Sequence, residues 1–196
     1  MTADSHGAAE PAVMALLKAR RSVRQFTAEP LPVATLHLLL EAAMAAPSAA
    51  ASDPWEFVVV TEPATLDKLR AGLLFARYEA PAAIVVCANI AIANNTVGRT
   101  HWVQDCSAAM ENLLIAATGL GLGAVWIGLY PEAHPQAVVR ATLNIPDEVI
   151  PLGMAYVGYP ASTPPPRTRY DARRVYWEQY EPRKRRAKKK NAKHQG

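Results

Sequence analysis

The sequence predicts a single domain in which strands alternate with helices, either an α+β or an α/β sandwich. Of its 196 residues, 51% are hydrophobic, which is enough to bury a sizeable core. Charged residues make up only 19%, and this proportion argues against disorder over most of the chain. Short apolar runs typical of buried strands recur between segments of helical character. These three observations indicate layers of strands and helices.

The N-terminal part is predicted to be helical after a loose leader at residues 1–10. A first helix is expected at about 11–21, because it starts with proline, which suits an opening helical position. Residues 32–46 are apolar nearly all round, which predicts a central, buried helix. Residues 47–54 form a loop of small residues bracketed by prolines.

Two buried strands are predicted next. Residues 55–61 include an unbroken apolar run that is too hydrophobic for an edge strand facing water. Residues 83–88 form the second strand, and a surface helix at 63–74 separates the two. The stretch at 89–101 is expected to be irregular.

Four further elements are predicted up to residue 159. They are a long helix at 102–120, a strand at 123–129, a short helix at 135–143 and a strand at 152–159. Four prolines in seven residues exclude regular structure at 160–166, and a short helix is expected at 171–180. The helices at 32–46 and 102–120 are apolar enough to indicate a large dimer interface, although a monomer core would also hold them.

The net charge of +4 hides an uneven distribution. Residues 183–196 carry eight basic side chains and no acidic one, so residues 1–182 have a net charge of −4. We expect a folded domain at 11–182 and a basic, disordered tail at 183–196. Such a tail can bind nucleic acid or anionic lipid by counterion release. A solvated tail is favoured over this non-enzymatic role, because no aromatic side chain is present to stack on bases.

Several features predict a cytoplasmic protein. The first dozen residues lack the order of a secretory signal. Cys87 and Cys106 lie in apolar surroundings, which favours buried structural thiols in a reducing compartment. Residues 113–130 are uncharged over 18 positions, but their four glycines and change of character favour a helix followed by a buried strand over a membrane span.

Familiar catalytic motifs are not found. The glycines at 119–123 follow a helix and precede a strand, which is the wrong order for a dinucleotide fingerprint. The five histidines are scattered, and no metal-ligand spacing is present. Asp105 and Glu111 are interpreted as polar positions on the long helix, not as an acid–base pair. If the protein is an enzyme, a bound organic cofactor is therefore expected to perform the chemistry.

The most informative segment is Arg20-Arg21-Ser22-Val23-Arg24. Arginine presents a planar fork of donors that suits phosphate oxygens and the edge of a polar ring. The alternative is that these cations only complement the negative end of the preceding helix. Further motifs along the chain favour the first interpretation.

These motifs resemble those of the FMN-dependent nitroreductase family over about residues 11–180. They are, in order, RRSVRQF at 20–26, APSAAASDPWEF at 46–57, GLGAVWIGLY at 121–130, GYP at 158–160 and PRTRY at 166–170. The resemblance implies an α+β fold, specifically a three-layer α/β/α sandwich with a central, mostly antiparallel sheet. It also implies an intertwined homodimer with FMN at the interface.

The resemblance further implies a set of flavin-binding residues. These are Arg20, Arg21, Ser22, Arg24, Pro47, Ser48, Ala49, Ala51, Ile127, Gly128, Leu129, Arg167 and Arg169. The arginines and Ser22 would hold the phosphate, the ribityl chain and the pyrimidine side of the ring. The loop residues would come from the partner subunit and pack on the flavin, and the 127–129 backbone would meet the ring edge.

Two loop positions depart from the family pattern. Ala51 stands where the family usually has asparagine, and Asp53 where it usually has glutamine. The first change removes a hydrogen bond typically worth about 1 kcal/mol net, and the second places a negative charge near a cofactor that is also negative when reduced. Flavin affinity, potential or substrate choice are therefore expected to differ from the family norm.

The function implied is hydride transfer from NADH or NADPH through FMN to a nitroaromatic, a quinone or a related small-molecule acceptor, in a ping-pong sequence. The flavin N5 would carry the hydride, so no side chain is predicted to be catalytic. The alternative within the family is another reaction, such as reductive dehalogenation, dehydrogenation or flavin breakdown.

Overall fold

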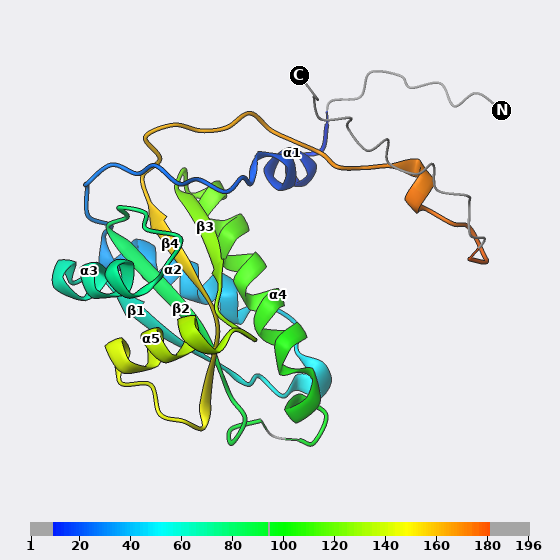
Figure 1. Ribbon diagram of the computed structural model, residues 1–196. Coiled ribbons are helices and arrows are strands. Elements are labelled where there is room, and N and C mark those ends of the chain that lie inside the picture. Colours follow the sequence, from blue (N-terminus) through cyan, green and yellow to red (C-terminus); the bar gives the residue numbers. More distant parts are fainter. Residues whose placement is uncertain (1–9, 94, 181–196) are drawn as a thin grey trace, which may run out of the picture.

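A four-stranded sheet forms the centre of the molecule (Figure 1). The computed structural model describes residues 10–93 and 95–180, so most of the predicted leader and the whole basic tail lie outside the described residues. The strands are β1 (Trp55–Val60), β2 (Ala82–Asn89), β3 (Gly123–Gly128) and β4 (Val149–Gly158). They lie in the order β1-β2-β4-β3, and each neighbouring pair is antiparallel. The predicted antiparallel sheet is confirmed.

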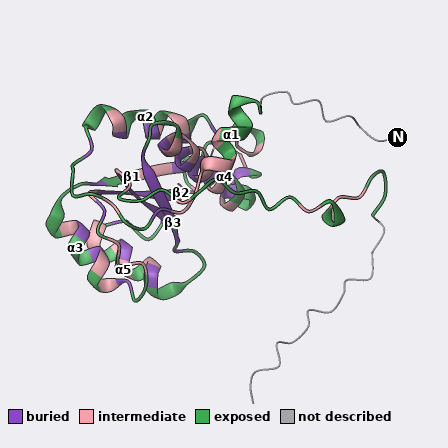
Figure 2. Ribbon diagram, turned by 90° about the horizontal axis from the view of Figure 1, so that it is seen from above, coloured by how far each residue is buried: buried purple, intermediate pink, exposed green. Residues whose placement is uncertain are grey.

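Helices cover both faces of this sheet (Figure 2). On one face lie α2 (Val33–Met44) and α4 (Gly98–Gly119), and on the other lie α3 (Pro63–Gly72) and α5 (Ala133–Leu143). Each helical layer encloses its own hydrophobic cluster against the sheet. The α+β, three-layer α/β/α sandwich is therefore confirmed.

The side chains of β2 show why two cores form. Ile84 and Val86 enter the core beneath α2 and α4, whereas Val85 and Cys87 enter the opposite core. All four side chains are fully buried, because successive residues of a strand point to opposite faces and helices cover both faces here. A strand covered on both faces is apolar at every position, which is the pattern that identified it in the sequence.

The strand at 55–60 is an edge strand, so the expectation that its apolar residues exclude that position was wrong. Trp55 packs in the core beneath α2 and α4, and Val60 packs in the core beneath α3 and α5. Only one valine of the strand, Val59, is exposed, at 37%. The apolar run indicates that helices cover both faces of β1. It does not indicate whether β1 has one or two neighbouring strands.

Two helix predictions also need correction. The long helix begins at Gly98 instead of residue 102, because the side chain of Asn95 accepts a hydrogen bond from Gly98 N at 2.8 Å and starts the helix early. Residues 171–180 form no α-helix. This stretch contains one 3₁₀ turn, η2 (Ala172–Arg174), whose first backbone N–H groups are capped by Asp171, which accepts from Arg173 N. No described helix combines the length and apolar character that crossing a membrane requires.

Two segments project from the body of the molecule. The helix α1 (Ala12–Ala19) has no buried residue, and the C-terminal arm (residues 160–180) extends away past it (Figure 1). Large hydrophobic side chains exposed on these segments are Val13, Met14 and Leu17 on α1 and Tyr170, Trp177 and Tyr180 on the arm. Apolar surface of this extent indicates a site of contact with another molecule.

The two cysteines are free and buried, as the sequence predicted. Burial raises the pKa of Cys87 and of Cys106 to about 12, and it also raises the pKa of Tyr156 to about 12. The hydroxyl of Tyr156 has no hydrogen-bond partner among the described residues.

We expect the free energy of unfolding to fall as the pH rises from about 9 toward 12. In that range the unfolded chain loses protons from both thiols and the phenol, while the folded chain retains them, so ionisation favours unfolding. Each group that is ionised in the unfolded chain and protonated in the folded chain lowers the free energy of unfolding by at most about 1.4 kcal/mol per pH unit. Urea titrations at pH 8, 9, 10 and 11 measure this free energy. A midpoint that stays constant over this range would contradict the prediction, and Cys87→Ala should flatten the slope.

Candidate functional site

The arginine segment (residues 20–24) lies where two distant parts of the chain run side by side. The segment that follows β4 runs back along the segment that follows α1. Thr27 N donates a hydrogen bond to Tyr159 O at 2.9 Å, and Arg167 N donates to Lys18 O at 2.9 Å. The fold therefore brings the N-terminal arginines and Arg167 to the same end of the molecule.

The first two arginines each have a partner that holds the side chain. Arg20 Nε forms an ion pair with Glu111 of α4, with 3.2 Å between Nε and Oε1. Both side chains of this pair are partly exposed, at 30% and 47%. The guanidinium of Arg21 donates to the carbonyl of Pro165 in the C-terminal arm. Arg21 therefore joins the two segments, and the Arg20 pair is open to exchange with a stronger anion.

The remaining cations are more exposed. Arg24 Nε donates to the hydroxyl of Tyr78 at 3.2 Å, and its Nη1 lies 3.4 Å from Ser22 O. Arg167 is held by the backbone hydrogen bond from its N–H to Lys18 O, and its side chain is exposed. Arg169 is exposed two residues further along the C-terminal arm. At least four guanidinium-bearing residues therefore belong to one end of the fold, with accessible side chains.

A close backbone contact fixes the arginine segment against β3. Val23 is 5% exposed, and its N–H donates to Ala124 O at 2.9 Å. Opposite it, Gly123 leaves the necessary space, because a Cβ at that position would lie 2.6 Å from Cγ1 of Val23. The apolar Val23 thus anchors a segment whose polar neighbours point outward.

The far end of β3 leaves part of its backbone open. Since Ala124 O faces Val23, strand alternation turns the backbone groups of Gly128 toward the same edge, where no other described strand pairs. A Cβ at Gly128 would meet nothing within 4 Å. The side chains of Ile127 and Leu129 are buried in the core, at 5% and 0% exposure. Any ligand at this position would therefore meet backbone and open space.

The small-residue loop (residues 47–54) is tied to the first half of α4. Ala49 N donates to Oδ1 of Asp105 at 2.9 Å, and the Ser52 hydroxyl donates to Oδ2 at 3.2 Å. The hydroxyl of Ser48 donates to the Asp53 carboxylate and accepts from Asp53 N at 3.1 Å. The single hydroxyl proton of Ser48 is therefore used within the loop.

A single copy of the chain does not bring this loop to the arginine segment. The loop lies beside the N-terminal part of α4, whereas α1 lies beside its C-terminal end (Figure 1). There the side chain of Leu16 lies close to Gly119. Pro47 and Ala51, two predicted flavin contacts, are exposed at the loop surface. The predicted site residues thus form two separate groups in the described chain.

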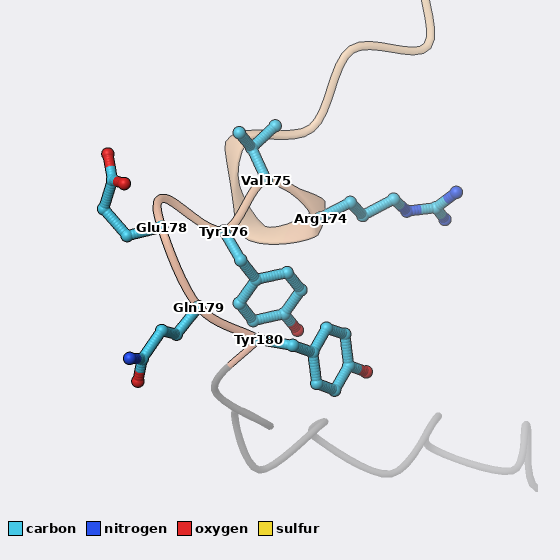
Figure 3. Close-up of a pocket in the computed structure, with 6 residues that line it drawn as sticks. All are labelled: Arg174, Val175, Tyr176, Glu178, Gln179 and Tyr180. Carbon is cyan, nitrogen blue, oxygen red and sulfur yellow. The ribbon is translucent and has the colours of Figure 1, made fainter.

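Two cavities formed by the described residues lie elsewhere. A cavity of about 490 Å³ is formed within the C-terminal arm by residues 174–176 and 178–180, and the ring centroids of Tyr176 and Tyr180 are 4.4 Å apart (Figure 3). A groove of about 620 Å³ lies between α2, β1 and the connection from α5 to β4. Neither contains a predicted flavin-binding residue. No group of three potential metal ligands occurs among the described residues.

Sequence reasoning missed the structural roles of three residues. Asp105 is only 4% exposed and organises the small-residue loop, although it was interpreted as an ordinary polar position. Its place between Trp102 and Cys106 on the apolar side of α4 was the available signal, because an acid in an apolar stripe needs partners. Glu111 and Tyr78 contact Arg20 and Arg24 across long sequence separations, and no local pattern reveals such pairs.

Comparisons with known proteins agree with this geometry. The chain matches the profile of the Nitroreductase family over residues 17–75 and 68–159. It is 38% identical over 170 residues to a protein of Methanothermobacter thermautotrophicus provisionally named NADH dehydrogenase/NAD(P)H nitroreductase, covering 86% of this chain and 87% of that protein.

Two solved structures are similar over most of the fold. A Parabacteroides distasonis protein with the same provisional name superposes with a TM-score of 0.80 at 38% identity, covering 87% of this chain and all of that one. A provisionally named nitroreductase from Desulfovibrio desulfuricans, crystallised in complex with FMN, has a TM-score of 0.72 at 27% identity, covering 88% of this chain and 99% of that one. The sequence match over most of the chain and the shared fold show that this protein belongs to the nitroreductase family.

Proposed function

We propose that this protein is an FMN-dependent oxidoreductase that transfers a hydride from NADH or NADPH to a nitroaromatic, quinone or related acceptor. The observation that carries the proposal is the convergence of Arg20, Arg21, Arg24 and Arg167 beside the open edge of β3. The FMN complex of the Desulfovibrio desulfuricans relative supports the choice of cofactor. A cytoplasmic location would supply both the flavin and the nicotinamide.

The residues present fit an aromatic ring system that carries a phosphate. Guanidinium groups pair with phosphate oxygens in two-pronged fashion, and the partly exposed Arg20 can exchange its carboxylate partner for a more highly charged phosphate. The unobstructed Gly128 leaves room for a flat ring at the end of β3. Arg24, oriented by the Tyr78 hydroxyl, would provide positive charge beside the ring. When bound, FMN supplies the hydride-accepting and hydride-donating atom, and the protein binds, orients and tunes it.

We further propose that the site is completed by a second copy of the chain. The small-residue loop lies at the opposite end of α4 from α1, so the loop of a partner subunit would supply Pro47, Ser48, Ala49 and Ala51 over the ring. The exposed apolar side chains of α1 and the C-terminal arm offer the surface for an intertwined homodimer. The small loop side chains would leave one face of the ring open for a nicotinamide and then an acceptor.

The decisive experiment is an absorption spectrum of the purified protein after reconstitution with FMN, followed by anaerobic titration with NADH and with NADPH. We expect a yellow protein that loses its visible absorbance on titration and regains it when menadione or nitrofurazone is added. A protein that stays colourless after reconstitution would end the proposal. A yellow protein that neither nicotinamide bleaches would indicate another reaction of the family.

We expect removal of residues 170–196 to weaken the dimer by at least about 100-fold. The deletion removes Tyr170, Trp177 and Tyr180, each at least 71% exposed, and full burial of one such side chain contributes about 1.5–3 kcal/mol. Sedimentation equilibrium measures the dissociation constant. Deletion of residues 183–196 alone is the control and should leave it unchanged. Equal effects of the two deletions would show that the arm does not hold the dimer.

A further inference from the structure

Asp105 is the most deeply buried acidic side chain among the described residues, at 4% exposure. Both of its carboxylate oxygens are used by the small-residue loop, Oδ1 by Ala49 N at 2.9 Å and Oδ2 by the Ser52 hydroxyl at 3.2 Å. A carboxylate withdrawn from water is costly unless donors satisfy it. Here the donors come from a segment more than fifty residues away, so the two hydrogen bonds fix the position of the loop on α4.

The loop needs such support because its backbone is strained. Ala50, Ala51 and Asp53 all have positive φ, at 51°, 52° and 43°, although none of them is glycine. Residues other than glycine pay an energetic penalty in this region, and surrounding contacts must stabilise them there. Three such residues within four positions do not hold this shape by local preference.

A second set of contacts holds the same loop from the segment before α4. The side-chain amide of Asn95 donates to Ala50 O at 3.0 Å, while its oxygen accepts from Gly98 N at 2.8 Å. At Gly98 a Cβ would lie 2.4 Å from Cβ of Ser52, so the first turn of α4 touches the loop directly. The loop is thus held at several points against one helix end, and Asp105 supplies the only charged group in these contacts.

We propose that Asp105 is a positioning residue: it holds the small-residue loop in the strained shape that presents Ser48 to Ala51 to the flavin of the partner subunit. This inference rests on the proposed function. The carboxylate suits the role because it accepts from both donors at once, and hydrogen bonds to a charged acceptor are stronger than neutral ones. An asparagine at this position would accept from Ala49 N through its one oxygen and would place its NH₂ group, a donor, beside the Ser52 hydroxyl. It would therefore replace the carboxylate only in part.

The experiment compares Asp105→Asn and Asp105→Ala with Asn112→Ala in the full-length protein. Asn112 also lies on α4 and also tethers a distant segment, because its amide donates to Ala42 O of α2 at 3.0 Å. The Asn112→Ala variant therefore removes a hydrogen bond from α4 to a distant segment while leaving the contacts of the small-residue loop in place. Urea unfolding, amide hydrogen exchange across residues 49–53 without FMN, the dissociation constant for FMN, and kcat and KM for NADH are measured for each.

We expect exchange at Ala49 and Ser52 to be at least tenfold faster in Asp105→Ala, and FMN to bind about 10- to 100-fold more weakly. Asp105→Asn should lie between this variant and the unsubstituted protein. Asn112→Ala should lower the urea midpoint but leave loop exchange and the FMN constant unchanged. FMN binding in folded Asp105→Asn equal to that of the unsubstituted protein would overturn the proposal, as would unchanged loop exchange in both Asp105 variants.

The two proposals fail in different ways. If the unsubstituted protein does not bind FMN, the proposed function fails and the exchange measurement still tests whether Asp105 orders the loop. If the unsubstituted protein binds FMN normally and both Asp105 variants do as well, the positioning role fails and the proposed function stands.

Discussion

Replacing Arg20 with alanine is expected to weaken FMN binding by about 10- to 150-fold, the equivalent of about 1.5–3 kcal/mol for hydrogen bonds to a charged group. The Arg20 side chain is only 30% exposed and lies at the end of the fold where Arg21 and Arg167 also lie. Its present partner, Glu111, is 47% exposed, and such partly solvated pairs contribute little to stability. The substitution should therefore change cofactor affinity much more than it changes the free energy of unfolding.

Two further variants separate the charge of Arg20 from its shape. Arg20→Lys keeps the charge but loses the two-pronged geometry, so its FMN affinity should fall between those of the unsubstituted protein and Arg20→Ala. Glu111→Gln removes the carboxylate that competes with the phosphate for Arg20. It should tighten FMN binding by a few-fold, whereas Arg20→Ala should weaken it. Fluorescence quenching of FMN on titration with apoprotein gives all four constants. If Arg20→Ala binds FMN as tightly as the unsubstituted protein, Arg20 does not hold the phosphate.

Replacing Gly123 with alanine is expected to destabilise the protein by about 1–3 kcal/mol, the usual cost of overpacking. The new Cβ would lie 2.6 Å from Cγ1 and 2.8 Å from Cβ of Val23. Since the contact includes Cβ, rotation of the Val23 side chain cannot relieve it, and the backbone of the arginine segment has to move. FMN affinity should therefore fall together with stability, as urea unfolding and flavin titration will show.

Gly119→Ala is the matched control. Its Cβ would meet the methyl groups of Leu16 at 3.7 and 3.8 Å, which is ordinary contact. Alanine is also the better helix former by about 1 kcal/mol, so this variant should be neutral or slightly stabilised. Combining Gly123→Ala with Val23→Ala should recover part of the loss, because the smaller side chain makes room. If the double variant loses more free energy of unfolding than the two single variants together, contact between the new Cβ and Val23 is not the cause of the destabilisation.

The layered fold was predictable because its signals are local. The run from Ile84 to Cys87 is apolar at every position, which identifies a strand covered on both faces. The same reasoning failed for the strand at 55–60, since burial of both faces does not reveal whether another strand pairs along the edge. The C-terminal arm is another such case. The sequence predicts a short helix at 171–180, but this stretch contains one 3₁₀ turn, and Trp177 and Tyr180 are exposed.

The sequence by itself determined the order and type of the main elements, the buried state of both cysteines and the residue types of the candidate site. It could do so because periodicity, apolar runs and arginine clusters involve residues that are close together in the sequence. Only the tertiary structure decided which distant residues meet: Arg167 beside Lys18, Arg20 with Glu111, and Asp105 beneath Ala49 and Ser52. The physical reason is that such contacts depend on how the helices and strands pack in three dimensions, and no pattern within a single element encodes them.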